Sequence, residues 1–123
     1  MLVLAYKEFF VKELEWLGSS KKDLMKFPKE VIQEVGYALY FAQKRGRYGK
    51  VKLFRGYGSG VYEMVTEYNK NAYRVVYIVS LSDTVYVVHC FQKKSKRNIK
   101  TPKEEIEIIK QRLKLLRAEI SRR

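Results

Sequence analysis

Three consecutive segments rich in Val, Ile and Tyr are the feature that most constrains the fold. They occupy residues 61–68, 73–81 and 84–92, and β-branched and aromatic side chains favour strands. Residues 69–71 (Asn-Lys-Asn) and 82–83 (Ser-Asp) separate them, and both are good turn sequences. Because neither connection is long enough for a helical crossover, we expect an antiparallel meander and not parallel pairing among these strands.

The residues before this meander predict a short strand and two helices. Residues 14–17 have the composition of a short early strand. Ser19 or Ser20 is a suitable cap for a short helix. Pro28 is then placed to open a second helix that ends at about Gln43, because apolar residues recur on one helical face. That face consists of Val31, Ile32, Val35, Leu39 and Ala42.

The segment just before the meander predicts a loop, and the segment after it predicts a helix. Residues 44–60 are basic and glycine-rich without an acidic residue, and they predict a loop with room for one short strand. Thr101-Pro102-Lys103-Glu104 combines a capping box with proline at the first helical position. An apolar stripe at alternating steps of three and four residues then predicts a C-terminal helix. The stripe consists of Ile106, Ile109, Leu113, Leu116 and Ile120.

The charge balance is strongly basic and indicates an anionic partner. The 123 residues include 26 Lys and Arg against 13 Asp and Glu, which gives a formal net charge of +13 at pH 7. Such a field concentrates polyanions at the protein surface, so RNA, DNA or an acidic protein is the expected partner. The alternative is a basic surface that only keeps the chain soluble or draws it to an anionic membrane.

The cysteine content and the hydropathy pattern favour a cytoplasmic protein. Cys90 is the only cysteine, so no intrachain disulfide can form and a reducing compartment is expected. No apolar run approaches the roughly 20 residues that cross a bilayer. We therefore expect one soluble cytoplasmic domain that occupies residues 1–123 and has no membrane partner.

Several kinds of catalytic centre lack the residues that they need. A metal site requires clustered His, Cys, Asp or Glu side chains, and the only His and the only Cys, His89 and Cys90, face opposite sides of one predicted strand. A catalytic triad lacks support because His89 is the sole imidazole and no serine lies on a glycine-rich elbow. The glycine-rich residues 55–60 lack the Lys-Ser or Lys-Thr ending of a nucleotide loop. No metal or other cofactor is therefore expected.

The remaining candidates are arginine and lysine side chains, which can suffice for RNA cleavage. When a ribose 2′-hydroxyl attacks the neighbouring phosphate, the protein must accept one proton, donate another and stabilise charge on the phosphate oxygens. Arg74 is the first candidate for the phosphate, because a guanidinium binds it bidentately and stays charged. Lys93 and Lys94 are adjacent, so one of them faces the cleft if the segment is extended. Cationic neighbours lower the pKa of a lysine and so suit it to proton transfer.

Each candidate also has a purely structural interpretation. Arg74 and Glu63 can form a cross-strand ion pair that fixes the strand register. The basic segment 93–103 can be a solvated loop, and His89 is more often a packed strand residue than a catalyst. Tyr57 and Tyr48, in the basic loop, are better candidates for stacking on a base than the tyrosines of the strands.

The order of several short motifs resembles one family of bacterial proteins. The motifs are Asp23-Leu24, Phe27-Pro28, Gly36-Tyr-Ala-Leu39, Gly60-Val-Tyr-Glu63, Tyr73-Arg-Val75, Val85-Tyr-Val-Val-His89, Phe91-Gln-Lys-Lys94 and Thr101-Pro102. No single motif is specific, but their order and spacing from about residue 12 to residue 116 resemble the phage-derived, HigB-like branch of the RelE superfamily. Members of that superfamily are the toxin components of bacterial toxin–antitoxin systems.

This resemblance implies an α+β fold with two N-terminal helices, a curved antiparallel sheet of about four strands and a C-terminal helix. Residues 1–11 would extend the usual N-terminus. The resemblance also implies a metal-independent endoribonuclease that cleaves mRNA, usually in the ribosomal decoding site. An antitoxin, often with a helix-turn-helix domain, would neutralise the toxin, and DNA would be contacted only through that antitoxin.

On matching positions, the resemblance marks Arg74, Lys93 and Lys94 as active residues and Glu63 as a lesser candidate. The basic loops would hold the RNA through Arg47, Lys52, Arg55, Tyr57, Lys96 and Arg97. Two further hypotheses stay open. The chain could bind RNA or the ribosome with the same surface and not cut, or it could be a degenerate toxin that serves as a partner-binding subunit.

Overall fold

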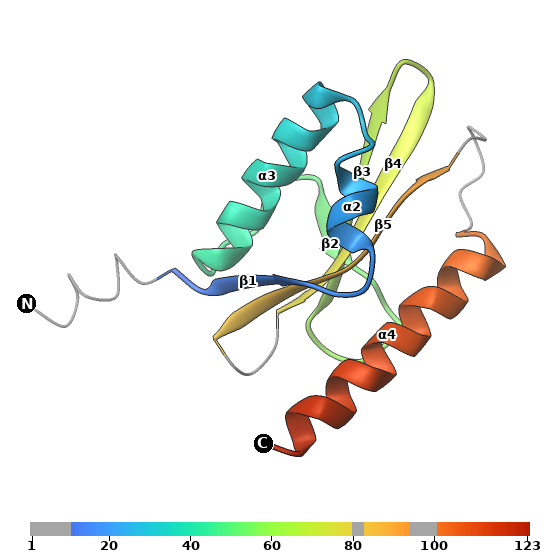
Figure 1. Ribbon diagram of the computed structural model, residues 1–123. Coiled ribbons are helices and arrows are strands. Elements are labelled where there is room, and N and C mark those ends of the chain that lie inside the picture. Colours follow the sequence, from blue (N-terminus) through green and yellow to red (C-terminus); the bar gives the residue numbers. More distant parts are fainter. Residues whose placement is uncertain (1–10, 80–82, 94–100) are drawn as a thin grey trace, which may run out of the picture.

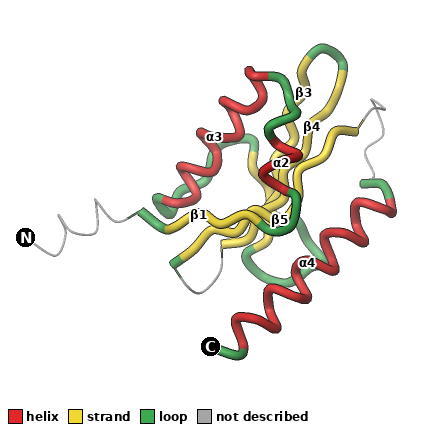
Figure 2. The backbone as a smooth tube through the Cα atoms, viewed as in Figure 1, coloured by secondary structure: helices red, strands yellow, loops and turns green. Residues whose placement is uncertain are grey.

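The computed structural model describes residues 11–79, 83–93 and 101–123 and shows a five-stranded sheet with helices on both faces (Figure 1). In chain order, the elements are β1 (Glu13–Trp16), α2 (Ser20–Leu24), α3 (Lys29–Gln43), β2 (Val51–Leu53), β3 (Val61–Tyr68), β4 (Asn71–Val79), β5 (Thr84–Lys93) and α4 (Lys103–Ser121). The strand order is β1-β5-β4-β3-β2. The helices α2 and α3 cover one face of the sheet, and α4 crosses the other (Figure 2).

The predicted meander is present as β3, β4 and β5, which pair antiparallel. A tight turn joins β3 to β4, and its residues Asn69 and Lys70 have positive φ angles of 50° and 67°. Two such residues give the hairpin turn that matches the twist of the strands. The β4–β5 ladder contains a bulge between Val76 and Tyr77. The meander prediction is therefore confirmed, with one irregularity that the sequence does not mark.

The sheet is mixed and not wholly antiparallel, because β1 pairs parallel with β5 from Glu13 opposite Thr84 to Trp16 opposite Val87. A parallel pair needs a long connection, and two helices and three strands lie between these elements in the chain. β2 forms the other edge by antiparallel pairing with β3. The α+β class and both short strands are confirmed, while the sheet has five strands where about four were expected.

The central strand β4 is buried on both faces, and its side chains alternate between two apolar cores. Tyr73, Val75 and Tyr77 belong to the core under α2 and α3. Val76 and Ile78 belong to the core under α4. The long helices contribute Val31, Val35, Leu39, Ile109, Leu113 and Leu116 to these cores. The apolar faces predicted for both helices are therefore the faces that pack on the sheet.

His89 and Cys90 project to opposite faces of β5, as strand alternation predicts. Cys90 is buried in the core on the α3 side, and burial raises the pKa of its thiol to about 12. A buried thiol of this kind stays protonated at neutral pH and is unreactive. His89 faces α4, where it contacts Glu105 and Arg112.

Both long helices begin one residue later than predicted. Pro28 and Pro102 occupy the N-cap positions of α3 and α4, each with a ψ angle of 147°, and not the first helical position. The carbonyl of Pro102 accepts hydrogen bonds from the amides of Glu105 and Ile106, and no side chain caps the helix. The capping box predicted at Thr101 is therefore wrong, and proline with its fixed φ marks the residue before the helix.

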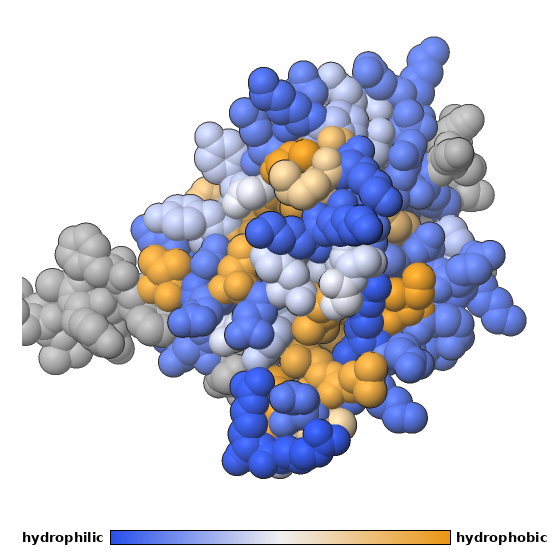
Figure 3. Space-filling model, in the orientation of Figure 1, coloured by the Kyte–Doolittle hydropathy of each residue, from blue (hydrophilic) through white to orange (hydrophobic). Residues whose placement is uncertain are grey.

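Hydrophilic side chains cover most of the face seen in Figure 3, and apolar atoms are exposed beside α4. On that helix, Leu115 is 61% exposed.

Among the helices that the structure describes, none is both long enough and apolar enough to cross a membrane.

Glu34 connects α3 to the edge of the sheet. Its carboxylate lies 2.7 Å from the Lys50 ammonium and accepts hydrogen bonds from Tyr48 at 3.1 Å and from Thr66 at 3.3 Å. The hydrogen bond from Lys50 is the main reason that the pKa of Glu34 is lowered, and Tyr48 adds to it against the effect of burial. These contacts join the helix, the loop before β2, and β3 at one side chain.

Replacing Glu34 with Gln should lower the free energy of unfolding by about 1 kcal/mol at neutral pH, because it weakens three polar contacts. The folded-state pKa lies below that of the unfolded chain, so this contribution is present above about pH 4.3 and is lost as the pH falls through the folded-state pKa. Denaturant unfolding of both proteins across this range measures it. An equal difference between variant and wild type at all pH values would contradict the role of the carboxylate charge.

Candidate active site

Three of the predicted active residues, Glu63, Arg74 and Lys93, lie on the α4 face of the sheet. Arg74 is directly opposite Phe91, which belongs to the core under α4. Lys93 is two residues beyond Phe91 and therefore projects to the same face. Glu63 is opposite Val76, which belongs to that core as well. The β3–β4 hairpin and the end of β5 thus place the three residues on one side of the sheet.

Arg74 and Glu63 form an ion pair across the two strands. Nη1 of Arg74 lies 3.1 Å from Oε2 of Glu63, and the two side chains are 8% and 18% exposed. The pair joins diagonal neighbours of the β3–β4 ladder, so it fixes the register as the structural interpretation of these residues requires. It also holds the guanidinium in one place and orientation, which bidentate binding of a phosphate requires as well.

Lys93 ends β5 and is half-buried. Loss of solvent lowers the pKa of its ammonium group, and the positive charge of Arg74 lowers that pKa further. A lysine with a lowered pKa exchanges protons more readily near neutral pH than an ordinary surface lysine. The other predicted cations of this segment, Lys94, Lys96 and Arg97, lie outside the described residues, and their roles stay predictions.

A partly buried network beside these residues joins the sheet to α4, and no sequence motif marks it. Nε2 of His89, a buried side chain, lies 2.6 Å from the carboxylate of Glu105. Nδ1 of the same ring lies 3.3 Å from Nη1 of Arg112. Because a guanidinium only donates hydrogen bonds and a carboxylate only accepts them, Nδ1 accepts from Arg112 and Nε2 donates to Glu105. His89 is therefore a packed strand residue, the interpretation that the sequence favoured.

Arg112 extends this network to the start of α2. Its Nη1 donates to the carbonyl of Val88 at 2.9 Å, and its Nη2 donates to Oγ of Ser19 at 3.1 Å. Ser19 occupies the N-cap of α2, but its hydroxyl donates to Asp23 at 2.7 Å and caps no backbone amide. One arginine side chain thus ties α4, β5 and α2 together.

The predicted RNA-binding residues in β2 and in the loop after it are placed on or near the α4 face. Lys52 lies directly opposite Glu63 in the ladder and therefore shares its face. Arg55 is exposed in the loop between β2 and β3. The ring of Tyr57 stacks on Phe54 with centroids 4.9 Å apart and packs against the core under α4. Tyr57 is thus anchored to the core.

Arg47 lies on the opposite face of the sheet. Its guanidinium carbon is 5.6 Å from the centre of the Tyr62 ring, and Tyr62 packs against the core under α2 and α3. The sheet therefore separates Arg47 from Arg74. The basic residues of the α3–β3 connection therefore do not all share one surface, because Lys52 faces the side of Glu63 and Arg47 faces the other.

The part of the chain that the structure describes contains no group of three or more His, Cys, Asp or Glu side chains that could hold a metal ion. His89 is paired with Glu105, and Arg112 already places a cation beside that ring. A second cation would be repelled there.

Comparison with known proteins assigns the family. The family model of the phage-derived Gp49-like proteins (DUF891) matches residues 22–114. The chain belongs to this family. Together with the fold, this membership confirms the predicted resemblance to a phage-derived branch of the RelE superfamily. No curated protein matches the sequence significantly.

Two solved structures resemble this Gp49-like chain. A mutant of the E. coli toxin RelE in the free state is 18% identical, with 86% of this chain and 98% of that chain covered at a TM-score of 0.57. The toxin–antitoxin complex RelBE2 from Mycobacterium tuberculosis is 16% identical, with 71% and 97% covered at a TM-score of 0.48. The likeness to RelE confirms the predicted fold class.

Replacing Arg112 with Ala should destabilise the protein by about 2–3 kcal/mol, because the variant loses hydrogen bonds from a charged group to three partners. Chemical denaturation measures this loss. Lys114→Ala, on the exposed side of the same helix, is the control and should change stability by less than about 0.5 kcal/mol. If both variants lost the same stability, the network would not be what holds α4 on the sheet.

Proposed function

We propose that this chain is the toxin of a type II toxin–antitoxin system and acts as a metal-independent endoribonuclease that cleaves mRNA on the ribosome, in the cytoplasm. Membership of the phage-derived Gp49-like family and the RelE-like fold support the toxin assignment. One observation carries the chemistry. Arg74 lies near Lys93, whose pKa it helps to lower, on one face of a strongly basic protein.

In the proposed reaction, the ribose 2′-hydroxyl attacks the adjacent phosphorus, and the bond from phosphorus to the 5′-oxygen breaks. Arg74 binds the phosphate oxygens and stabilises the negative charge that develops on them. Lys93, as the neutral amine, accepts the proton of the 2′-hydroxyl. The leaving 5′-oxygen receives a proton from Lys94 or from water. Glu63 does not react but positions the guanidinium of Arg74 through their ion pair.

The same proposal assigns the surrounding cations to RNA binding. Lys52, Arg55, Lys96 and Arg97 hold the RNA backbone through its phosphates, which fixes the register of the strand without reading its sequence. The formal net charge of +13 also favours an acidic protein partner. That partner is the cognate antitoxin, which carries a helix-turn-helix domain and makes the contact with DNA.

One observation favours a second candidate function, a protein that binds RNA or the ribosome without cutting. Arg74 is almost fully buried and is paired with Glu63, which is the arrangement of a structural ion pair. The basic surface would then supply affinity alone. A degenerate toxin that serves as a partner-binding subunit would have the same features. Both alternatives predict RNA binding without new 5′ ends.

Replacing Arg74 with Lys should reduce mRNA cleavage by about 100- to 1,000-fold, because lysine keeps the charge but loses the planar fork that binds phosphate. Purified protein with ribosomes and labelled mRNA, followed by primer extension, measures the rate. Arg122→Lys, beyond the end of α4, is the matched control and should cut at the wild-type rate. Circular dichroism and denaturation establish that each variant is folded. Full-rate cleavage by folded Arg74→Lys and Arg74→Ala would overturn the assignment.

Replacing Lys93 with Arg keeps a positive charge but removes a group that loses its proton far more easily than a guanidinium does. Cleavage should fall by about 100-fold or more. In the wild type, the cleavage rate should rise with pH, because the lowered pKa of Lys93 increases the fraction of neutral amine. This rise should disappear in Lys93→Arg. Lys94→Arg, measured in parallel, decides which lysine acts. An unchanged rate and pH profile in Lys93→Arg would exclude proton transfer by Lys93.

A further inference from the structure

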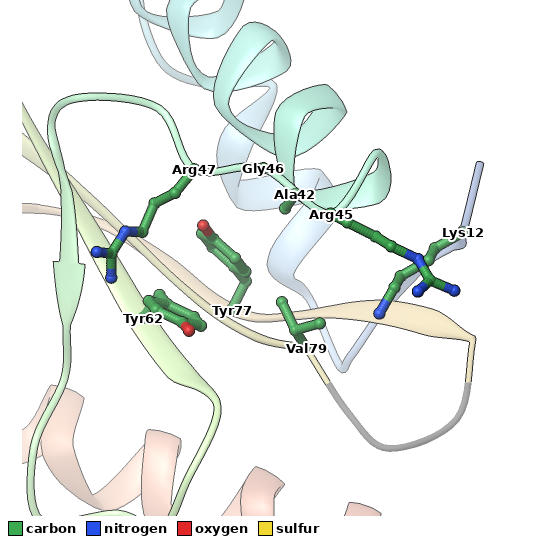
Figure 4. Close-up of a pocket in the computed structure, with 8 residues that line it drawn as sticks. All are labelled: Lys12, Ala42, Arg45, Gly46, Arg47, Tyr62, Tyr77 and Val79. Atoms are coloured by element: carbon green, nitrogen blue, oxygen red, sulfur yellow. The ribbon is translucent and has the colours of Figure 1, made fainter. Parts of the chain in front are cut away.

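A basic pocket lies on the face of the sheet opposite Arg74, between the end of α3 and the strands β3 and β4 (Figure 4). Its volume is about 320 Å³, at the lower end of the range of ligand sites. It is lined by Lys12, Ala42, Arg45, Gly46, Arg47, Tyr62, Tyr77 and Val79. Three of these residues are cationic and none is acidic, so the lining favours an anion.

The turn that carries the two arginines is held by the end of α3. The amide of Arg45 donates to the carbonyl of Ala42 at 3.1 Å, and the amide of Gly46 donates to the carbonyl of Phe41 at 2.7 Å. Arg45 has a φ angle of 68°, a left-handed conformation that is unfavourable for a residue with a side chain. The turn therefore places Arg45 and Arg47 at opposite ends of the pocket, and their side chains extend away from each other (Figure 4), so each guanidinium can hold a separate anionic group.

The floor of the pocket is a pair of tyrosines. The rings of Tyr62 and Tyr77 stack with centroids 5.6 Å apart, and the hydroxyl of Tyr77 points toward the turn at Gly46 (Figure 4). Burial raises the pKa of Tyr77 to about 12, so its hydroxyl stays protonated and can donate a hydrogen bond to an anion.

The arrangement favours a carboxylate over an RNA nucleotide as the anion. Proteins that hold single-stranded RNA usually offer an aromatic face on which a base can stack. Here the ring of Tyr62 is already engaged by Arg47 and Tyr77, so it is a poor platform for a base. An RNA strand bound at Arg74 would also lie on the other face of the sheet.

The surface of α3 next to the pocket is suited to a protein partner. Tyr37, Tyr40 and Phe41 are 64%, 48% and 42% exposed, and exposed aromatic residues are typical of protein interfaces. A second copy of this chain is a poor occupant, because two molecules of net charge +13 repel each other. An acidic partner is attracted by the same charge.

We propose that this pocket is a docking site for an acidic segment of a protein partner, with one Glu or Asp carboxylate held at Arg45 and another at Arg47. Lys12 adds a third positive charge on the Arg45 side of the pocket, and the hydroxyl of Tyr77 donates from the floor. The site does not depend on RNA cleavage, since the pocket and Arg74 lie on opposite faces of the sheet. The two proposals can therefore fail separately.

Two probes of equal formal charge test the site, a fluorescein-labelled oligoglutamate and a labelled oligouridylate, with binding measured by fluorescence anisotropy. Arg45→Gln/Arg47→Gln should weaken the binding of oligoglutamate by about tenfold or more, because charge-assisted hydrogen bonds are lost. The affinity for oligouridylate should change by less than about threefold. Lys12→Gln, a second variant of the pocket, should act in the same direction with a smaller effect.

Lys110→Gln/Lys114→Gln is the charge-matched control, because both lysines are exposed on α4 outside the pocket. It should lower the affinity for the two probes equally and by less than about threefold. If the arginine variant and this control lowered the affinity for oligoglutamate to the same extent, the binding would depend on net charge alone and the proposal would be wrong. If the arginine variant lost more affinity for oligouridylate than for oligoglutamate, the pocket would be an RNA site, and this result would also overturn the proposal.

Discussion

The position of β4 at the centre of the sheet determines the rest of the structure. The strand is hydrogen-bonded on both sides, and its side chains enter two separate cores. A shift of its register by one residue would turn each side chain of β4 to the opposite face of the sheet. Arg74 would then be buried among the apolar residues under α3, and Tyr77 would lie under α4. Burial of the large apolar side chains therefore fixes the register that places Arg74 beside Glu63. The ion pair between them is a consequence of that register.

The α4 face combines structural and chemical demands at neighbouring positions. Glu63 compensates the charge of Arg74 in a place with little solvent, where an unpaired guanidinium would be strongly destabilising. His89, Glu105 and Arg112 hold α4 against the same face through hydrogen bonds. The cations proposed to act on RNA thus rest on a scaffold in which the neighbouring charges are already paired. Preorganised charges of this kind are what stabilisation of a phosphate transition state requires.

Local sequence patterns were sufficient for the elements but not for contacts between distant segments. The turn at Asn69 and the apolar stripes of α3 and α4 were predicted because they depend on residues a few positions apart. The parallel pairing of β1 and the hydrogen bond from Arg112 to His89 join residues far apart in the chain. The spacing of apolar residues along the sequence does not predict such contacts. The basic residues between α3 and β3 predict one surface, yet Arg47 and Lys52 lie on opposite faces, because side chains alternate along β2 and Val51 takes the face of the core under α3.

The chemistry of the RNA ends tests the central claim most directly, that arginine and lysine side chains cleave RNA through its own 2′-hydroxyl. Fragments made by the purified protein from ribosome-bound mRNA can be treated with a kinase that phosphorylates 5′-hydroxyls and with a cyclic phosphodiesterase that opens 2′,3′-cyclic phosphates. Attack by the 2′-hydroxyl must leave a 5′-hydroxyl on one fragment and a cyclic phosphate or its 3′-phosphate hydrolysis product on the other. Fragments with 5′-phosphate and 3′-hydroxyl ends, or no fragments at all, would contradict the account.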